Sequence, residues 1–214
     1  MKTVFLCLLV SILAISCKNG QSAEDYYNAG VAKMQEKSDP NDKSGSVKAA
    51  LQDFDKAIEL NPEYADALER RAVIRRSLND YAGAMQDAEK MTSINPKNKN
   101  AFYFIGQSKL FHQDYAGSIK AYTQALALDT AFAQSYYERG RCEKELNNYD
   151  AALKDFNHAI SSSNKSDKFY HTFYLSRGEL KIAMNDKAGA CGDLYVAVSL
   201  GDPFAQDLIN SHCK

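Results

Sequence analysis

The chain repeats a pattern of residues at intervals of 34, and this period constrains its fold more than any other feature. Tyr81, Tyr115 and Tyr149 stand 34 residues apart, each after a polar pair that suits the start of a helix and three positions before a small residue. The pairs and small residues are Asn79-Asp80 with Ala84, Gln113-Asp114 with Ser118, and Asn147-Asn148 with Ala152. A recurring period of this length indicates stacked supersecondary units.

Other positions extend the period over five units. Two series recur at intervals of 34, 34, 34 and 38 residues: Phe54, Ala88, Tyr122, Phe156 and Leu194, and Ala57, Met91, Ala125, Ala159 and Ala197. Pro62 and Pro96 close the first two units, because proline lacks the backbone donor and disfavours helical geometry in the preceding residue. The units therefore read as helix-turn-helix elements.

A 34-residue helix-turn-helix unit with a small residue early in its second helix resembles the tetratricopeptide repeat. The resemblance implies an all-α, right-handed superhelical solenoid over 23–214, with an inner helix A and an outer helix B in each of about five units. The units run over 23–64, 65–98, 99–132, 133–166 and 171–204, and a capping helix at about 204–212 covers the last apolar face.

Some positions depart from the family pattern. The fourth position holds Tyr26, Leu68, Phe102, Tyr136 and Tyr174 in place of tryptophan, and the seventh holds Arg71, Arg139 and Arg177 in place of leucine. This arginine variant resembles tetratricopeptide lipoproteins of Bacteroidetes-type bacteria, and its side chain is expected to snorkel along its neighbours or to pair with a carboxylate. Two insertions, 38–45 and 167–170, lengthen the array, and the first is predicted to be a surface loop.

The N-terminus forms a separate segment. After Lys2, an apolar run from Val4 to Ile15 is too short to span a bilayer that needs roughly 20 residues, so 1–16 is interpreted as a signal peptide. The sequence Ala-Ile-Ser before Cys17 resembles a bacterial lipobox, which implies lipidation of Cys17 and a short tether over 17–22. Cleavage without lipid and an uncleaved anchor are the alternatives. Lys18 favours the outer membrane by the same resemblance, with the periplasmic or surface face left open.

The sequence contains no recognisable catalytic, metal or cofactor motif. His112, His158, His171 and His212 are scattered over the chain without metal-ligand spacing, and neither a nucleophile elbow nor a phosphate-binding loop is present. The formal net charge is −1, so the composition does not supply the concentrated basic surface that nucleic-acid binding requires. We therefore expect no enzyme activity, no cofactor, no metal and no nucleic-acid partner.

Three cysteines remain beyond Cys17. Cys191 falls in the second helix of unit five, and Cys213 follows the capping helix that should pack on it. In an oxidising compartment these two can form a disulfide if their Cα atoms lie about 4.4 to 6.8 Å apart, and otherwise they act as buried apolar thiols. Cys142 has no sequence partner and is expected to be a packed free thiol.

The family resemblance implies a concave surface lined by the A helices, which binds a protein or peptide segment. The expected lining residues are Arg70, Val73, Arg76, Tyr103, Phe104, Gln107, Phe111, Tyr137, Arg141 and Lys144. An aromatic and basic groove of this kind would take an acidic or C-terminal segment, unless the aromatic side chains only pack between hairpins. The sequence thus predicts a lipid-anchored scaffold or adaptor at the bacterial cell envelope, or alternatively a structural subunit of an outer-membrane or envelope assembly.

Overall fold

The computed structural model describes residues 21–35 and 43–214, and every regular element in these ranges is an α-helix. The helices are α1 (Ala23–Gln35), α2 (Lys43–Leu60), α3 (Ala65–Ser77), α4 (Tyr81–Ile94), α5 (Lys99–Phe111), α6 (Tyr115–Leu128), α7 (Ala133–Glu145), α8 (Tyr149–Ser162), α9 (Tyr170–Ala183), α10 (Lys187–Ser199) and α11 (Ala205–His212). The predicted all-α fold is confirmed.

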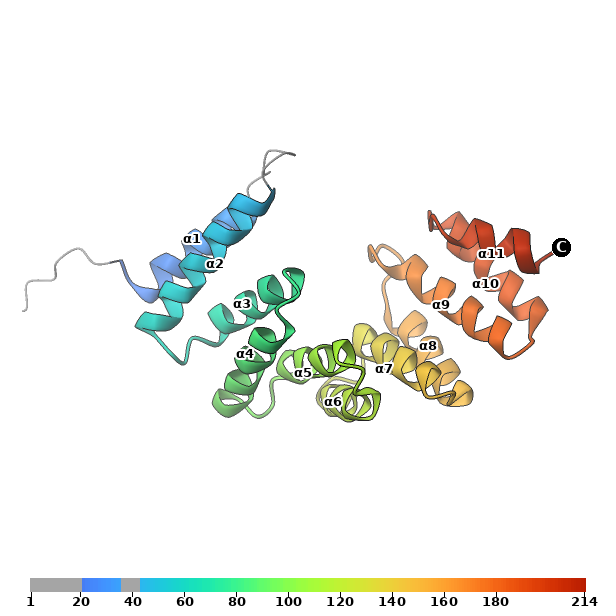
Figure 1. The fold of residues 1–214 in the computed structure, drawn as a ribbon, viewed down its shortest axis with the longest axis horizontal. Coiled ribbons are helices and arrows are strands. Elements are labelled where there is room, and N and C mark those ends of the chain that lie inside the picture. Colours follow the sequence, from blue (N-terminus) through green and yellow to red (C-terminus); the bar gives the residue numbers. More distant parts are fainter. Residues whose placement is uncertain (1–20, 36–42) are drawn as a thin grey trace, which may run out of the picture.

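The helices form hairpins that stack in chain order into an arch (Figure 1). Each helix packs mainly against the helices before and after it, and the A helices α3, α5, α7 and α9 also contact one another in succession. Helices α1 and α2 form one end of the arch, and α10 and α11 form the other. This neighbour-to-neighbour packing is the architecture of a repeat solenoid, so the expected solenoid is confirmed as well.

The turns inside the hairpins repeat one backbone geometry. Four residues adopt a left-handed conformation with φ of 59° to 62° at equivalent turns: Asn79, Gln113, Asn147 and Asn185. The next residue caps the following helix where it is an aspartate: the side chain of Asp80 accepts a hydrogen bond from the Gly83 amide at 2.8 Å, and Asp114 and Asp186 do the same one and three units later. Asn148 occupies the equivalent position without such a bond.

The paired helices approach closely because their facing residues are matched in size. A Cβ atom added at Gly106 on α5 would lie 2.4 Å from the ring of Tyr122 on α6, and one added at Gly140 would lie 3.0 Å from Phe156. Unit two instead holds a small residue at both equivalent positions, Ala72 and Ala88, and both side chains are fully buried. The large aromatic residue of a hairpin thus requires glycine on the facing helix.

The arginines at the seventh position pair with carboxylates, which decides between the two expectations for them. Arg139 donates two hydrogen bonds to Asp155 at 2.8 and 2.7 Å, and the corresponding pairs in units two and five are Arg71 with Asp87 and Arg177 with Asp193. Each guanidinium also reaches back to the B helix of the preceding hairpin, where it contacts Asp55, Thr123 or Asn157. The arginine therefore connects three helices in sequence.

The first insertion differs in part from its prediction. Helix α2 begins at Lys43, so the expected surface loop over 38–45 is wrong for its last three residues. No proline stands between Lys43 and Val47, and extending a formed helix backward adds one hydrogen bond for each residue fixed. The insertion therefore lengthens α2 to 18 residues.

A short helix and a disulfide close the C-terminal end. Helix α11 packs on α10 through Ala205 and Ile209, which lie in one core cluster with Leu194. Cys191 and Cys213 are joined by a disulfide with their Cα atoms 5.7 Å apart, which is the first of the two expected arrangements. Cys142 is buried and free, and burial raises the pKa of its thiol to about 12.

The N-terminal predictions concern residues outside the described ranges. The signal peptide over 1–16 and the lipid site at Cys17 therefore stay predictions. Within 21–35 and 43–214, no helix has both the length and the apolar character needed to cross a bilayer.

Candidate partner-binding groove

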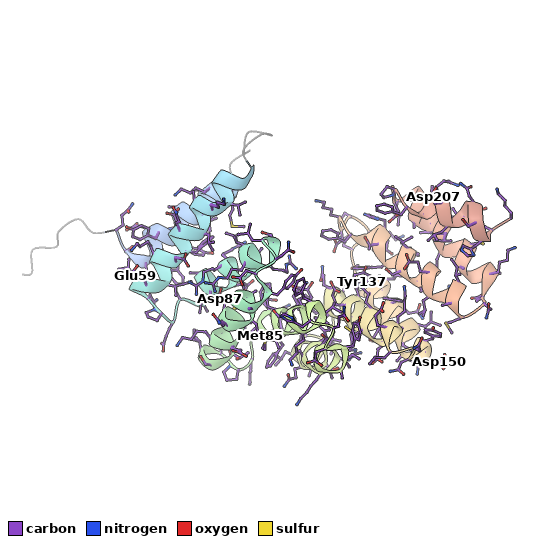
Figure 2. The ribbon with its side chains drawn as sticks, in the orientation of Figure 1. Glu59, Met85, Asp87, Tyr137, Asp150 and Asp207 are labelled. Atoms are coloured by element: carbon purple, nitrogen blue, oxygen red, sulfur yellow. A yellow bond between two sulfur atoms is a disulfide. The ribbon has the colours of Figure 1, made fainter. Side chains whose placement is uncertain are left out.

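The inner surface of the arch carries three adjoining cavities between successive A helices. The central cavity, of about 400 Å³, lies among α3, α5, α7 and α9. The α5–α7 cavity has a volume of about 430 Å³ and the α7–α9 cavity about 400 Å³. We call these three cavities the groove. Tyr137 lines two of them and lies near the middle of the array (Figure 2).

The central cavity has mainly aromatic walls. Tyr103 contacts Phe132 with ring centroids 5.2 Å apart, and Tyr137 contacts Phe173 at 4.9 Å. Phe104 is almost fully buried, at 5% exposure, yet contributes to the wall. These aromatic side chains pack between hairpins and also line the cavity, and their role in binding stays a prediction.

The second insertion leaves one aromatic side chain exposed at this cavity. Tyr27 contacts Tyr64, the residue before α3, just as Tyr103 contacts Phe132 before α7. Residues 167–170 shift this register at α9, so that Tyr137 contacts a residue inside the helix instead. Phe169, the residue before α9, is left 56% exposed while still lining the cavity.

Nine of the ten expected lining residues lie at the groove. Those at the central cavity are Val73, Arg76, Tyr103, Phe104, Gln107 and Tyr137; Phe111 and Arg141 line the α5–α7 cavity, and Lys144 lines the α7–α9 cavity. Arg70 is exposed on α3 and lines none of the three. Its side chain is offset from the stripe formed by Glu69, Val73 and Arg76.

Carboxylates balance the basic side chains that line the groove. Four glutamates line the groove, namely Glu69, Glu138, Glu145 and Glu179, against the three cations Arg76, Arg141 and Lys144. Arg141 pairs with Glu138 at 2.8 Å, and Lys144 pairs with Glu179 at 3.0 Å. The groove is therefore aromatic with charges of both signs, instead of aromatic and basic.

A polar network crosses the floor of the groove from α3 to α5. Arg76 donates to the side-chain oxygen of Gln107 at 2.9 Å, and Gln107 donates to the Tyr103 hydroxyl at 2.9 Å. Within the described residues no ion pair joins Arg76 to a carboxylate. Burial raises the pKa of the Glu138 carboxyl, and the charge of Arg141 opposes this shift.

Helical spacing alone could have located the missed glutamates. Glu145 stands four residues after Arg141, and Glu69 stands seven residues before Arg76, so each shares a helix face with an expected lining residue. Phe132 and Phe169 are harder to recognise as lining residues from the sequence, because they precede α7 and α9 and helical spacing does not reach them.

The described residues of the groove form no arrangement of side chains that indicates catalysis or metal binding. Among residues 21–35 and 43–214, no three His, Cys, Asp or Glu side chains converge where they could hold a metal ion. The physical features that remain are concavity, aromatic surface and paired charges, which suit recognition of a polypeptide.

The sequence matches the family model described as tetratricopeptide repeat over residues 42–99 and 105–167, more than half of the chain. The chain belongs to the tetratricopeptide repeat family. Arrays of this family present extended surfaces that bind protein or peptide partners and generally act as scaffolds without enzyme activity. No curated protein matches the chain.

Solved tetratricopeptide repeat proteins share the fold at low sequence identity. A thermophilic repeat protein from Thermus thermophilus, TTC0263, is 16% identical with a TM-score of 0.68, and the match covers 90% of this chain and 99% of that one. MamA from Desulfovibrio magneticus is 17% identical with a TM-score of 0.69, over 85% and 96% of the two chains. YrrB, a repeat protein described as having an unusual peptide-binding site, is 18% identical with a TM-score of 0.62, over 88% of this chain and 92% of that one.

Proposed function

We propose that this protein is an adaptor that holds an extended segment of a partner protein in its groove. The central cavity carries the proposal, because aromatic side chains around a concave surface are the groups that most often supply binding energy. The structure of YrrB, described as having a peptide-binding site, supports a peptide ligand on an array of this kind.

The segment would place an apolar side chain in the central cavity and a carboxylate against Arg76. The cavity is closed on one side by Tyr103, Phe104 and Tyr137, which offer an apolar contact surface. Arg76 lines the same cavity and donates a hydrogen bond to the neutral amide of Gln107. Its charge also acts on the buried Glu138 carboxyl, but no ion pair holds it among the described residues, so it can pair with an acidic side chain or a C-terminal carboxylate of the ligand. Arg141 and Lys144 are less suited to this role, because each already pairs with a glutamate.

A matched pair of charge reversals on α3 tests this function. Peptides selected from a random library against the full chain should bind wild-type and the Arg70→Glu variant equally, since Arg70 is exposed outside the cavities. They should lose at least tenfold in affinity for Arg76→Glu, measured by fluorescence anisotropy. Failure to select any binder, or equal binding by both variants, would contradict a ligand site in the groove.

We further propose that the adaptor is tethered to the bacterial cell envelope, at the outer membrane, through a lipidated Cys17. The support is the lipobox resemblance of Ala14 to Cys17 and the following Lys18. In a Bacteroidetes-type host, the wild-type chain and a Cys7→Ser variant should incorporate an alkynyl fatty acid and fractionate with the membrane. Cys17→Ser should do neither, and membrane recovery of that variant would argue against the anchor. Co-purification in a fixed stoichiometry that survives Arg76→Glu would instead favour the structural-subunit alternative.

A further inference from the structure

The α5–α7 cavity differs in chemistry from the central cavity beside it. Tyr81 and Phe111 stack face to face there, with ring centroids 4.0 Å apart and planes inclined by 15°. Phe111 is 52% exposed although it is a large apolar residue, and Tyr115 adds a third ring to the lining. An exposed aromatic face inside a concavity is a surface that a ligand group can cover.

The charges in this cavity are unbalanced in favour of carboxylates. Glu138 and Glu145 line it together with one cation, Arg141. Arg141 donates to Glu138 at 2.8 Å, and Glu138 is only 13% exposed in its side chain. Glu145 is exposed at the rim, and no described residue pairs with it. The charge left unmatched in the α5–α7 cavity is therefore negative.

We propose that this cavity binds a lysine or arginine side chain of the partner segment, a specificity that rests on the peptide-binding function proposed above. The cation would pair with Glu145 while its aliphatic stem and charge lie against the Tyr81–Phe111 stack. An acidic side chain would meet two carboxylates, and an apolar one would bury the rim of the cavity without pairing Glu145.

The position of the cavity places this basic residue close to the apolar anchor. Gln107 and Glu138 line both the α5–α7 cavity and the central cavity, so the two sites share a wall. An extended segment that fills both would carry its basic residue a few positions from its apolar residue. The groove then selects a segment with a basic, an apolar and an acidic group, in keeping with the mixed charges of its own walls.

A double-mutant cycle between the protein and its peptides tests the proposal. Peptides selected on the full chain should contain a basic residue, and replacing it by glutamine should weaken binding about fivefold. Glu145→Gln should weaken the basic peptide by the same factor and leave the glutamine peptide unchanged. Glu89→Gln, which removes an exposed carboxylate from α4, should have no effect. The combination of Glu145→Lys with a peptide carrying glutamate in place of its basic residue should restore binding.

The outcomes separate this inference from the function on which it rests. Selected peptides that bind in an Arg76-dependent way but lack a basic residue, or that are insensitive to Glu145→Gln, would overturn the basic-residue site and leave the adaptor function intact. The absence of any groove-dependent binder would overturn both.

Discussion

Units three and four use different chemistry at the same place in the repeat. Unit four joins its two helices by the pair Arg139–Asp155, whereas unit three has Ile105 and Ala121 at the equivalent positions. Ala121 is 3% exposed, and Ile105 packs against the apolar cluster that unit two shares with α5, so unit three places apolar side chains where unit four places charges. Both members of the pair change together, so neither unit leaves a single charge unpaired at these two positions.

This difference indicates that the ion pair and the apolar pair are exchangeable as sets but not as single residues. A guanidinium that loses its buried carboxylate keeps its desolvation cost, while a well-packed apolar pair avoids that cost altogether.

The largest effect is expected from removing one member of the ionic pair. Asp155→Ala deprives Arg139 of its buried carboxylate partner and should lower the free energy of unfolding by about 3 kcal/mol. Urea unfolding followed by circular dichroism measures the change, and Asp150→Ala, at an exposed position on the same helix, is the control. A loss equal to that of the control would show that the pair contributes nothing.

A smaller loss of stability is expected from enlarging the glycine of unit three at which its two helices approach each other closely. Gly106→Ala would bring a Cβ atom within 2.4 Å of the Tyr122 ring, and we expect a loss of about 2 kcal/mol despite the better helix propensity of alanine. Gly140→Ala in unit four, where the nearest atom of Phe156 lies 3.0 Å away, should cost less in the same unfolding assay. If the two variants were equally stable, size matching between the helices would not limit their approach.

Replacing the ion pair of unit four by the two apolar residues of unit three should lower the stability by a smaller amount still. Arg139→Ile combined with Asp155→Ala recreates the apolar pair, and its stability should fall within about 1 kcal/mol of wild type. The same urea titration compares it with Asp155→Ala alone. A double variant as unstable as the single one would mean that the surroundings of the ion pair do not accept an apolar replacement.

The smallest effect concerns Cys142, which stands where unit three has Ser108. The thiol stays protonated in the folded chain up to a pKa of about 12 but ionises near pH 9 when unfolded, so stability is complete below pH 9 and declines between pH 9 and 12. At pH 9.5 this contributes a loss of roughly 0.8 kcal/mol. Cys142→Ser should show a shallower decline over this range in unfolding experiments, and an identical pH dependence would rule out the thiol as its source.

The period of the sequence was sufficient to predict the fold, because the same positions recur in all five units and only two insertions interrupt the spacing. Unit five was expected from His171 and α9 begins at Tyr170, while the cap expected at about 204–212 is α11, Ala205–His212. The sequence alone did not decide whether Arg139 pairs with a carboxylate. Asp155 nevertheless follows it by 16 residues, the same spacing as in the pairs Arg71–Asp87 and Arg177–Asp193. That regularity places the two side chains opposite each other across a hairpin.

The groove was less predictable than the fold. Helical spacing indicates which A-helix residues face inward, but the sign of the surface charge also depends on neighbours such as Glu138 that lie at the margin of this stripe. The exposure of Phe169 could not be read from the sequence, because it results from how four inserted residues shift one contact of Tyr137.

The covalent link between Cys191 and Cys213 makes the two ends of the arch mechanically unequal. The bond fastens the final helix to the hairpin beneath it, whereas α1 is held to α2 by noncovalent packing such as the contact of Gly30 with Phe54. Since each hairpin is supported only by its neighbours, unravelling under heat or tension should start at α1 and proceed toward the fastened end. A pull transmitted through an N-terminal tether would therefore strain the weaker end first.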